Sequence, residues 1–122
     1  MAVDFEFKDS VYWIRFSGEI EGGDMERIIA AFEKMESDHP VTPHRISDLT
    51  GVTDVKIGFD DVLGLAAQRR AKVFKNPFKS AIVANNEIQT GFARMFQTLN
   101  TNPQITIRIF PDAQAALAWI IP

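Results

Sequence analysis

The sequence predicts an α/β fold in which amphipathic helices pack against a single mixed, mostly parallel sheet. The short apolar run at 81–84 is typical of a strand that is covered on both faces. Apolar side chains then recur at helical spacing over 88–99, and alternating isoleucines indicate another strand at 105–110. A buried strand, an amphipathic helix and a second strand in succession form a βαβ unit with parallel strands.

The chain before this unit supplies a hairpin and two more helices. Apolar and polar side chains alternate over 3–8, and the short turn that follows predicts an antiparallel return over 11–16. An apolar stripe over 25–35 indicates a helix whose N-cap is Asp24. The other predicted elements are a strand at 44–49, a glycine-bearing loop at 50–58, a helix that begins near 60, and a last helix capped by Asp112. The predicted order is β-β-α-β-α-β-α-β-α.

The predicted core takes its residues from every layer of this arrangement. Each is a large apolar residue at an inward position of its strand or helix. They are Ile14, Phe16, Ile28, Phe32, Ile46, Leu65, Ile82, Val83, Phe92, Phe96, Ile107 and Leu117.

The composition is that of a globular protein in a reducing compartment. The 122 residues, 46% of them hydrophobic, are enough for a single domain over 1–122 with a real core. No cysteine is present, which excludes disulfides and thiolate sites. The acidic N-terminus does not resemble a signal peptide, and no apolar run is long enough to span a membrane. We therefore expect a cytoplasmic location.

No catalytic or cofactor motif is present. The chain has no P-loop, no Gly-x-Gly-x-x-Gly after a strand and no Gly-x-Ser-x-Gly elbow. His39 and His44 could ligate a metal with Asp48, but a helix-terminal histidine and a strand-entry residue explain them more simply. An enzyme would have only Asp48, His44 and Arg94 to use. We expect no cofactor and no catalysis.

A group of cations runs from the end of the second predicted helix to the start of the next strand. Interleaved with Phe74 and Phe78, it could form a nucleic-acid patch. Cations at a helix C-terminus and two core phenylalanines are the simpler interpretation, and a pI near 5.3 argues against nucleic acid as a partner. The cations are Arg69, Arg70, Lys72, Lys75 and Lys79.

Several segments together resemble a known family. Asp48-Leu-Thr-Gly-Val52 resembles the Asp-Leu-Ser-x-Val segment of STAS domains, the fold of the anti-sigma-factor antagonists. The order and spacing of four segments resemble the SpoIIAA-like family more closely; this family of small bacterial proteins is grouped with STAS and CRAL-TRIO lipid-binding domains. These segments are Arg45-x-x-Asp48-Leu49, Ala81-Ile-Val-Ala84, Gly91-Phe-Ala-Arg-Met-Phe96 with Leu99, and Phe110-x-Asp112 with Ala116-Leu-Ala-Trp119.

The sequence departs from the classical antagonists at their phosphorylated serine. In those proteins the segment runs on into Asp-Ser-Ser-Gly, but here residues 53–59 read Thr-Asp-Val-Lys-Ile-Gly-Phe and contain no serine. Thr50 and Thr53 are the only hydroxyl side chains in the loop predicted at 50–58, and neither lies at the switch position. The resemblance therefore implies the fold and a non-catalytic regulatory role without the phosphoserine switch.

Three functions remain open, in this order. The first is a regulatory module that binds a protein partner, whose identity the sequence does not give, and that forms a homodimer when free. The second is a carrier of a small apolar ligand or lipid, suggested by the CRAL-TRIO likeness and by ten phenylalanines. Among these, Phe74, Phe78, Phe92 and Phe96 could line a pocket. The third is an enzyme.

A binding site is expected where the parallel strands end. In open α/β sheets, ligands bind outside the carboxyl ends of the strands, and helix N-termini at that edge favour anions. Arg94 lies in an apolar stretch, so it either pairs with an acid such as Asp48 or binds an anion. The expected members of the edge are Asp48, Thr50, Thr53, Asn85, Asn86 and Arg94.

Overall fold

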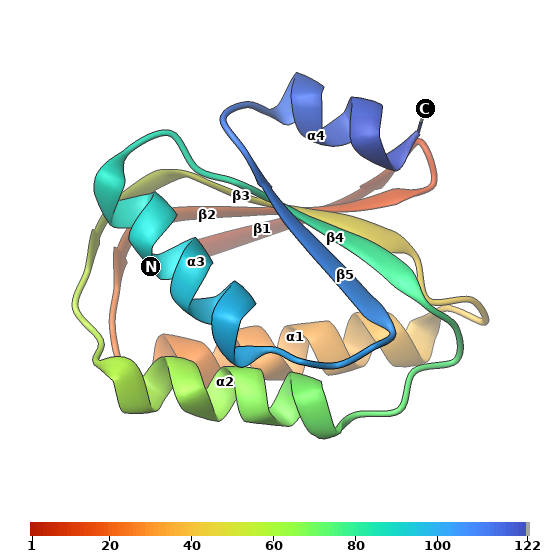
Figure 1. Ribbon diagram of the computed structural model, residues 1–122, viewed down its shortest axis with the longest axis horizontal. Helices are drawn as coiled ribbons and strands as arrows, with labels where there is room; N and C mark the ends of the chain where they lie inside the picture. Colours follow the sequence, from red (N-terminus) through yellow and green to blue (C-terminus); the bar gives the residue numbers. More distant parts are fainter. Residues whose placement is uncertain (122) are drawn as a thin grey trace.

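The computed structural model describes residues 1–121 and has the predicted order of elements (Figure 1). The five-stranded sheet has the order β1-β2-β3-β4-β5. β1 is antiparallel to β2, and the other neighbouring strands are parallel. The elements are β1 (Ala2–Lys8), β2 (Val11–Ile20), α1 (Asp24–Asp38), β3 (His44–Val55), α2 (Phe59–Ala71), β4 (Phe78–Val83), α3 (Glu87–Leu99), β5 (Ile105–Phe110) and α4 (Ala113–Ile120).

The helices form two unequal layers. α1, α2 and α3 lie on one face of the sheet and α4 lies on the other (Figure 1). Successive strand residues point to opposite faces, so Ile14 joins the larger core under α1–α3 while Trp13 joins the smaller core under α4. The stripe predicted on the first helix supplies Ile28 and Phe32 to the larger core. The predicted mixed sheet with packed helices is confirmed.

Eight of the twelve predicted core residues are buried. The other four, Phe92, Phe96, Ile107 and Leu117, are only partly buried and pack around the two cores. Phe92 and Phe96 lie on α3, which covers the sheet near β5, an edge strand, so part of each ring reaches the surface. The buried eight are Ile14, Phe16, Ile28, Phe32, Ile46, Leu65, Ile82 and Val83.

The loop predicted at 50–58 is wrong over most of its length. β3 continues to Val55 and pairs with β2 beyond Phe16, with Gly51 opposite Ser17 and a register shift beside them. Gly51 suggests a loop by sequence, but here it permits close packing of strands. A Cβ on it would lie 2.7 Å from the carbonyl oxygen of Phe16. Residues 50–55 at the carboxyl end of β3 therefore form a strand and not a loop.

Of the two predicted helix caps, Asp112 is confirmed and Asp24 is not. The Asp112 side chain accepts a hydrogen bond from Ala115 N at the start of α4, and the Asn86 side chain accepts one from Gln89 N at the start of α3. The N-cap of α1 is Gly23 rather than Asp24. Asp24 lies inside the helix, where its carboxylate accepts a hydrogen bond from Glu21 N at 2.7 Å and so closes the preceding turn.

Candidate functional site

The carboxyl ends of β3 and β4 are joined to α3 by one buried side chain, Gln89. Its exposed fraction is 1%. Its Nε2 donates to the carbonyl oxygens of Thr50 at 3.2 Å and Val52 at 2.9 Å, and its Oε1 accepts from Asn85 N at 2.9 Å. These contacts connect three backbone groups near the ends of β3 and β4 to the side chain of Gln89. Gln89 therefore fixes the first turn of α3 against the end of the sheet.

The predicted edge residues fall into two groups and one isolated position. Asn85, Asn86 and Arg94 line one shallow depression with the start of α3. Asp48 and Thr50 form a local pair, because the Asp48 carboxylate accepts from Thr50 N at 2.9 Å and from Thr50 Oγ1 at 2.7 Å. Thr53 is exposed on β3 and does not line the depression.

Arg94 does not use the structural partner that the sequence suggested. Its side chain is exposed, and no ion pair joins it to Asp48 within residues 1–121. It is free to reach an anion at the depression that it shares with Asn85 and Asn86.

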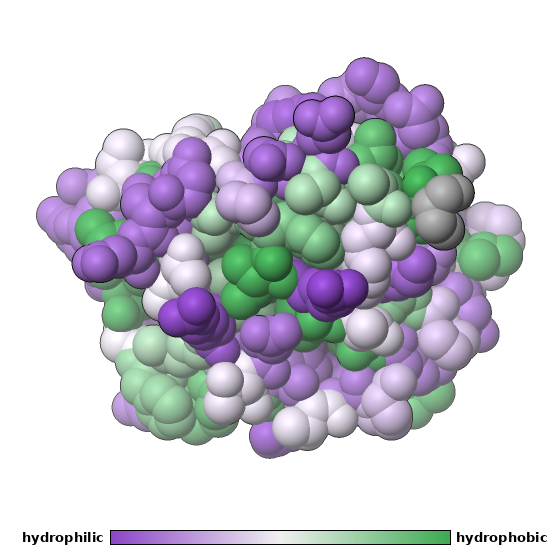
Figure 2. Space-filling model, turned by 45° about the horizontal axis from the view of Figure 1, so that its top comes forward, coloured by the Kyte–Doolittle hydropathy of each residue, from purple (hydrophilic) through white to green (hydrophobic). Residues whose placement is uncertain are grey.

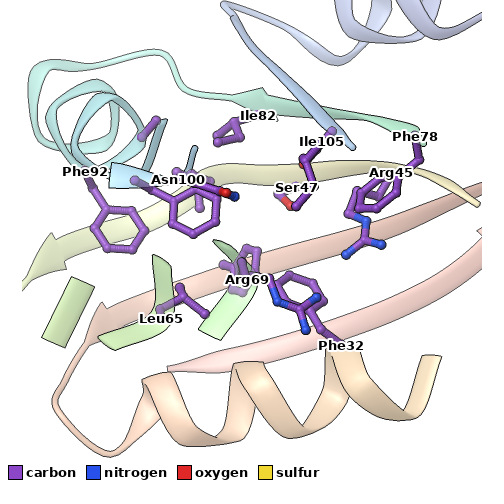
Figure 3. A pocket seen from close by; sticks show the side chains of 15 residues that line it. Phe32, Arg45, Ser47, Leu65, Arg69, Phe78, Ile82, Phe92, Asn100 and Ile105 are labelled. Atoms are coloured by element: carbon purple, nitrogen blue, oxygen red, sulfur yellow. The ribbon is translucent and has the colours of Figure 1, made fainter. Parts of the chain in front are cut away.

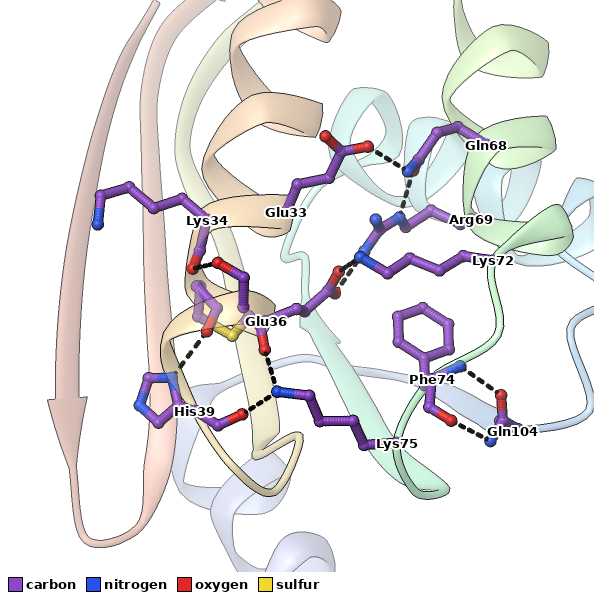
Figure 4. A network of polar contacts seen from close by, with 12 residues as sticks. Glu33, Lys34, Glu36, His39, Gln68, Arg69, Lys72, Phe74, Lys75 and Gln104 are labelled. Atoms are coloured by element: carbon purple, nitrogen blue, oxygen red, sulfur yellow. Dashed lines mark hydrogen bonds and ion pairs between the residues drawn. The ribbon is translucent and has the colours of Figure 1, made fainter.

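The strongest charge cluster lies elsewhere, between α1, β3 and α2. Glu36 has an exposed fraction of 4%, and its Oε2 accepts from Nη1 of both Arg45, at 2.9 Å, and Arg69. Lys72 Nζ lies 2.8 Å from Oε1. Figure 4 shows Arg69 and Lys72 converging on this carboxylate. One buried acid therefore faces three cations.

Sequence patterning contained a partial signal for this cluster. Glu36 lies four residues after Phe32 and eight after Ile28, so it falls on the buried stripe of α1. A carboxylate on such a stripe requires a buried cation. The sequence does not show which cation, because Arg45 and Arg69 come from other elements.

Burial and charge act in opposite directions on the cluster's pKa values. Burial disfavours the ionised form of Glu36, but the hydrogen bond from Arg69, the charge of Arg45 and the hydrogen bond from Lys72 together lower its pKa. Burial lowers the pKa of Arg45 to about 10, although Glu36 partly opposes that effect. The guanidinium of Arg45 is also stacked on aromatic rings, 4.1 Å from the Phe78 centroid and 5.3 Å from that of Phe32.

The cations considered as a nucleic-acid patch are mostly engaged within the protein. Arg69 is buried, which corrects its interpretation as a cation answering the dipole of its own helix. Lys75 donates to the carbonyl of His39 at the C-terminus of α1, and Lys79 donates to the carbonyl of Trp119 at the end of α4. These lysines do meet helix C-termini, but those of other helices. Phe74 and Phe78 are buried, as predicted.

An apolar cavity lies beside the charge cluster, under α2 and α3. It encloses about 60 Å³. Figure 3 shows the guanidinium groups of Arg45 and Arg69 at one end and Phe92 and Leu65 at the other. The lining residues are Phe16, Phe32, Arg45, Ser47, Leu49, Leu65, Arg69, Phe78, Ser80, Ile82, Phe92, Ala93, Phe96, Asn100 and Ile105.

This cavity limits the lipid-carrier alternative. Three of the four phenylalanines proposed as pocket lining do line it, and Phe74 does not. A cavity of about 150 Å³ holds one benzene molecule, so this smaller space has no room for the long acyl chain of a lipid.

The two histidines have structural contacts. His39 Nδ1 lies 2.7 Å from the carbonyl oxygen of Met35, and His44 Nδ1 accepts from Lys79 N at 2.8 Å. Within residues 1–121 no three His, Asp or Glu side chains are grouped so as to hold a metal ion. None of the helices in the same range is long and apolar enough to cross a bilayer.

Comparison with solved structures finds the same fold in three bacterial proteins. A protein with a SpoIIAA-like fold from Shewanella loihica PV-4 is 20% identical, with a TM-score of 0.64 over 98% of this chain and 92% of its own. An anti-sigma factor antagonist from Mycobacterium paratuberculosis is 16% identical, with a TM-score of 0.65 over 99% and 94%. SpoIIAA of Bacillus, a cell fate determinant solved in its phosphorylated form, is 19% identical, with a TM-score of 0.53 over 98% and 99%.

Family membership rests on the sequence itself. No curated protein matches the chain. The SpoIIAA-like family model, however, matches residues 11–121, which is nearly the whole chain and includes every segment that carried the resemblance. The chain belongs to the SpoIIAA-like family.

Proposed function

We propose that this chain forms one STAS-like domain that acts as a non-catalytic regulatory module in the cytoplasm and binds a protein partner. Membership of the SpoIIAA-like family and the fold shared with an anti-sigma factor antagonist support this role. The observation that carries the proposal is the edge around Gln89, where ordered backbone presents exposed polar side chains at the carboxyl ends of parallel strands.

The partner surface consists of Thr50, Thr53, Asn85, Asn86 and Arg94, with Asp48 as a supporting residue. The Asp48 carboxylate holds the Thr50 hydroxyl, and Gln89 holds the strand ends in register, so a partner meets a preorganised surface. Arg94 adds the one cation of the group and favours an acidic patch on the partner.

The molecular surface suits an exchangeable partner. On the face that Figure 2 shows, hydrophobic side chains form small groups separated by hydrophilic ones. Transient interfaces have this mixed character, whereas obligate ones are larger and more apolar. The free-state homodimer stays a prediction, which light scattering of the purified protein tests directly.

Site-specific photo-crosslinking in the host cell tests the proposed edge. A benzophenone side chain at Asn85 or Thr53 is expected to capture one discrete polypeptide, and the same group at Lys34 on α1 or Gln114 on α4 is not. All four positions are exposed, so the controls match in accessibility. Capture at Lys34 or Gln114 alone would place the partner on another face and contradict the proposed edge.

A further inference from the structure

Three residues that line the cavity carry buried hydrogen-bond donors without a partner in the described part of the chain. Nε and Nη2 of Arg45, Nη2 of Arg69 and Nδ2 of Asn100 are buried and have no hydrogen-bond partner within residues 1–121. Arg45 and Arg69 have exposed fractions of 3% and 2%. Buried donors are nearly always paired in folded proteins, so unpaired donors on three residues that line one cavity point to a ligand that carries acceptors.

The ring contacts do not replace that acceptor. Phe78 and Phe32 lie against the Arg45 guanidinium and interact with its charge through their faces. The N–H bonds of a guanidinium lie in its own plane and need acceptors there. Nε and Nη2 share one edge of the guanidinium, the edge that binds both oxygens of a carboxylate, while Nη1 on the other side is already bound to Glu36.

The local charge also requires an anion. Arg45 and Arg69 are both buried against the single carboxylate of Glu36, and Lys72 adds a third, partly exposed cation. Burial of uncompensated positive charge is unfavourable, and the lowered pKa of Arg45 reflects it. No Asp or Glu is among the residues that line the cavity.

The rest of the lining defines the other half of the ligand. Ser47 and Ser80 are polar residues on the sheet face next to Arg45, which is directly opposite Ser80 in the β3–β4 register. Beyond them the wall is apolar, with Leu65, Ile82 and Phe92. A bare inorganic anion would leave this apolar part empty, whereas a short hydrocarbon tail would fill it.

From this arrangement we propose that the cavity binds a short aliphatic monocarboxylate, with its carboxylate against Arg45 and Arg69 and its tail toward Leu65 and Phe92. A cavity of about 60 Å³ holds only a few water-sized groups, which limits the ligand to a tail of a few carbons. This site is separate from the edge around Gln89, and the proposal does not depend on the protein-interaction role.

The test is titration of the purified protein with sodium propionate, in a buffer free of carboxylates. Saturable binding is expected, with a dissociation constant of about 1 mM or below, the range open to so small a ligand. The Nε–Hε NMR signals of Arg45 and Arg69 are expected to shift together, and the melting temperature to rise with propionate concentration. Propionamide, which has the same shape without the charge, is the ligand control.

Two pairs of variants locate the site. Arg69→Gln removes one donor group and leaves Glu36 paired with Arg45 and Lys72, and in the folded variant propionate affinity should fall at least tenfold. Arg70→Gln, the exposed neighbour with the same change in charge, should leave affinity unchanged. Ala93→Leu fills the cavity from α3 and should abolish binding, whereas Ala118→Leu on the exposed side of α4 should not.

Each other outcome overturns the proposal. If propionate does not bind at about 100 mM, which is 100-fold above the expected dissociation constant, the cavity is not a site for short monocarboxylates. Equal binding of propionamide shows an apolar cavity without an anion site, and equal binding of chloride or nitrate shows a site for inorganic anions. Equal loss of affinity in Arg70→Gln and Arg69→Gln would show a nonspecific surface charge effect.

Discussion

Glu36 on α1 accepts a hydrogen bond from Arg45 on β3 at 2.9 Å, and both side chains are almost completely buried. The same carboxylate oxygen also binds Arg69 of α2. One acid thus ties two helices to the central strand of the sheet, in the middle of the apolar layer. The most direct predictions concern this cluster.

Replacing Glu36 with Gln should destabilise the protein by about 3–5 kcal/mol, because it leaves two buried guanidinium groups without a counter-charge. Urea unfolding at pH 7 measures the loss. Asp38→Asn on the same helix removes an exposed carboxylate paired with Lys34 and should have a much smaller effect. Equal losses in the two variants would mean that the buried pair has no special role.

The stability that Glu36 contributes should disappear in acid. Its pKa is lowered in the folded protein, so the contribution is complete above the unfolded value near 4.5 and is lost as pH falls through the folded pKa. Other acids also titrate there, so the quantity to follow is the difference in unfolding free energy between wild type and Glu36→Gln. That difference should stay constant from pH 7 to 5 and shrink below pH 4.5. A difference that grows in acid would reverse the assigned sign.

Gln89→Met keeps the size of the side chain but removes all its hydrogen bonds. The backbone groups of Asn85, Thr50 and Val52 then lose their partner, and the unfolding free energy should fall by about 1–3 kcal/mol. Amide exchange should accelerate at Asn85 in particular. Gln97→Met, which removes one half-buried bond to Ile107, should cost less and leave Asn85 protected.

Phe32 should matter more for stability than Phe92. Phe32 is 7% exposed and contacts both buried arginines, so Phe32→Ala should cost about 3–5 kcal/mol. Phe92 is only partly buried, and its truncation should cost clearly less. Parallel urea melts compare the two, and a larger loss at Phe92 would show that α3 packs more tightly than its exposure indicates.

No phosphorylation switch is expected in residues 50–61. The segment has no serine, and the Thr50 hydroxyl donates to Asp48 within an ordered strand. Incubation with host lysate and ATP, followed by intact-mass analysis and fragment mapping, should show no phosphate there. A phosphate on Thr50 or Thr53 would restore the kinase-regulated role of the classical antagonists.

The sequence by itself determined the order of elements and most of the buried stripes. These features follow from local periodicity, because an apolar side chain every second or every three to four residues defines the inner face of a strand or helix. The caps at Asn86 and Asp112 were local too, since each side chain bonds to a backbone three residues away. Family membership followed from the spacing of several such segments.

Only the tertiary structure decided what the polar core residues do. Glu36 and Arg69 are 33 residues apart, and no local pattern relates them. β3 continues past Thr50 because it pairs there with β2, beside a shift in the register of the two strands. Gly51 permits this pairing because it has no Cβ that would meet the carbonyl oxygen of Phe16. Arg45 and Ser80 face one cavity because two strands pair in that register. Long-range pairing places these groups together, and the free energy of burying charge and unpaired donors depends on that placement.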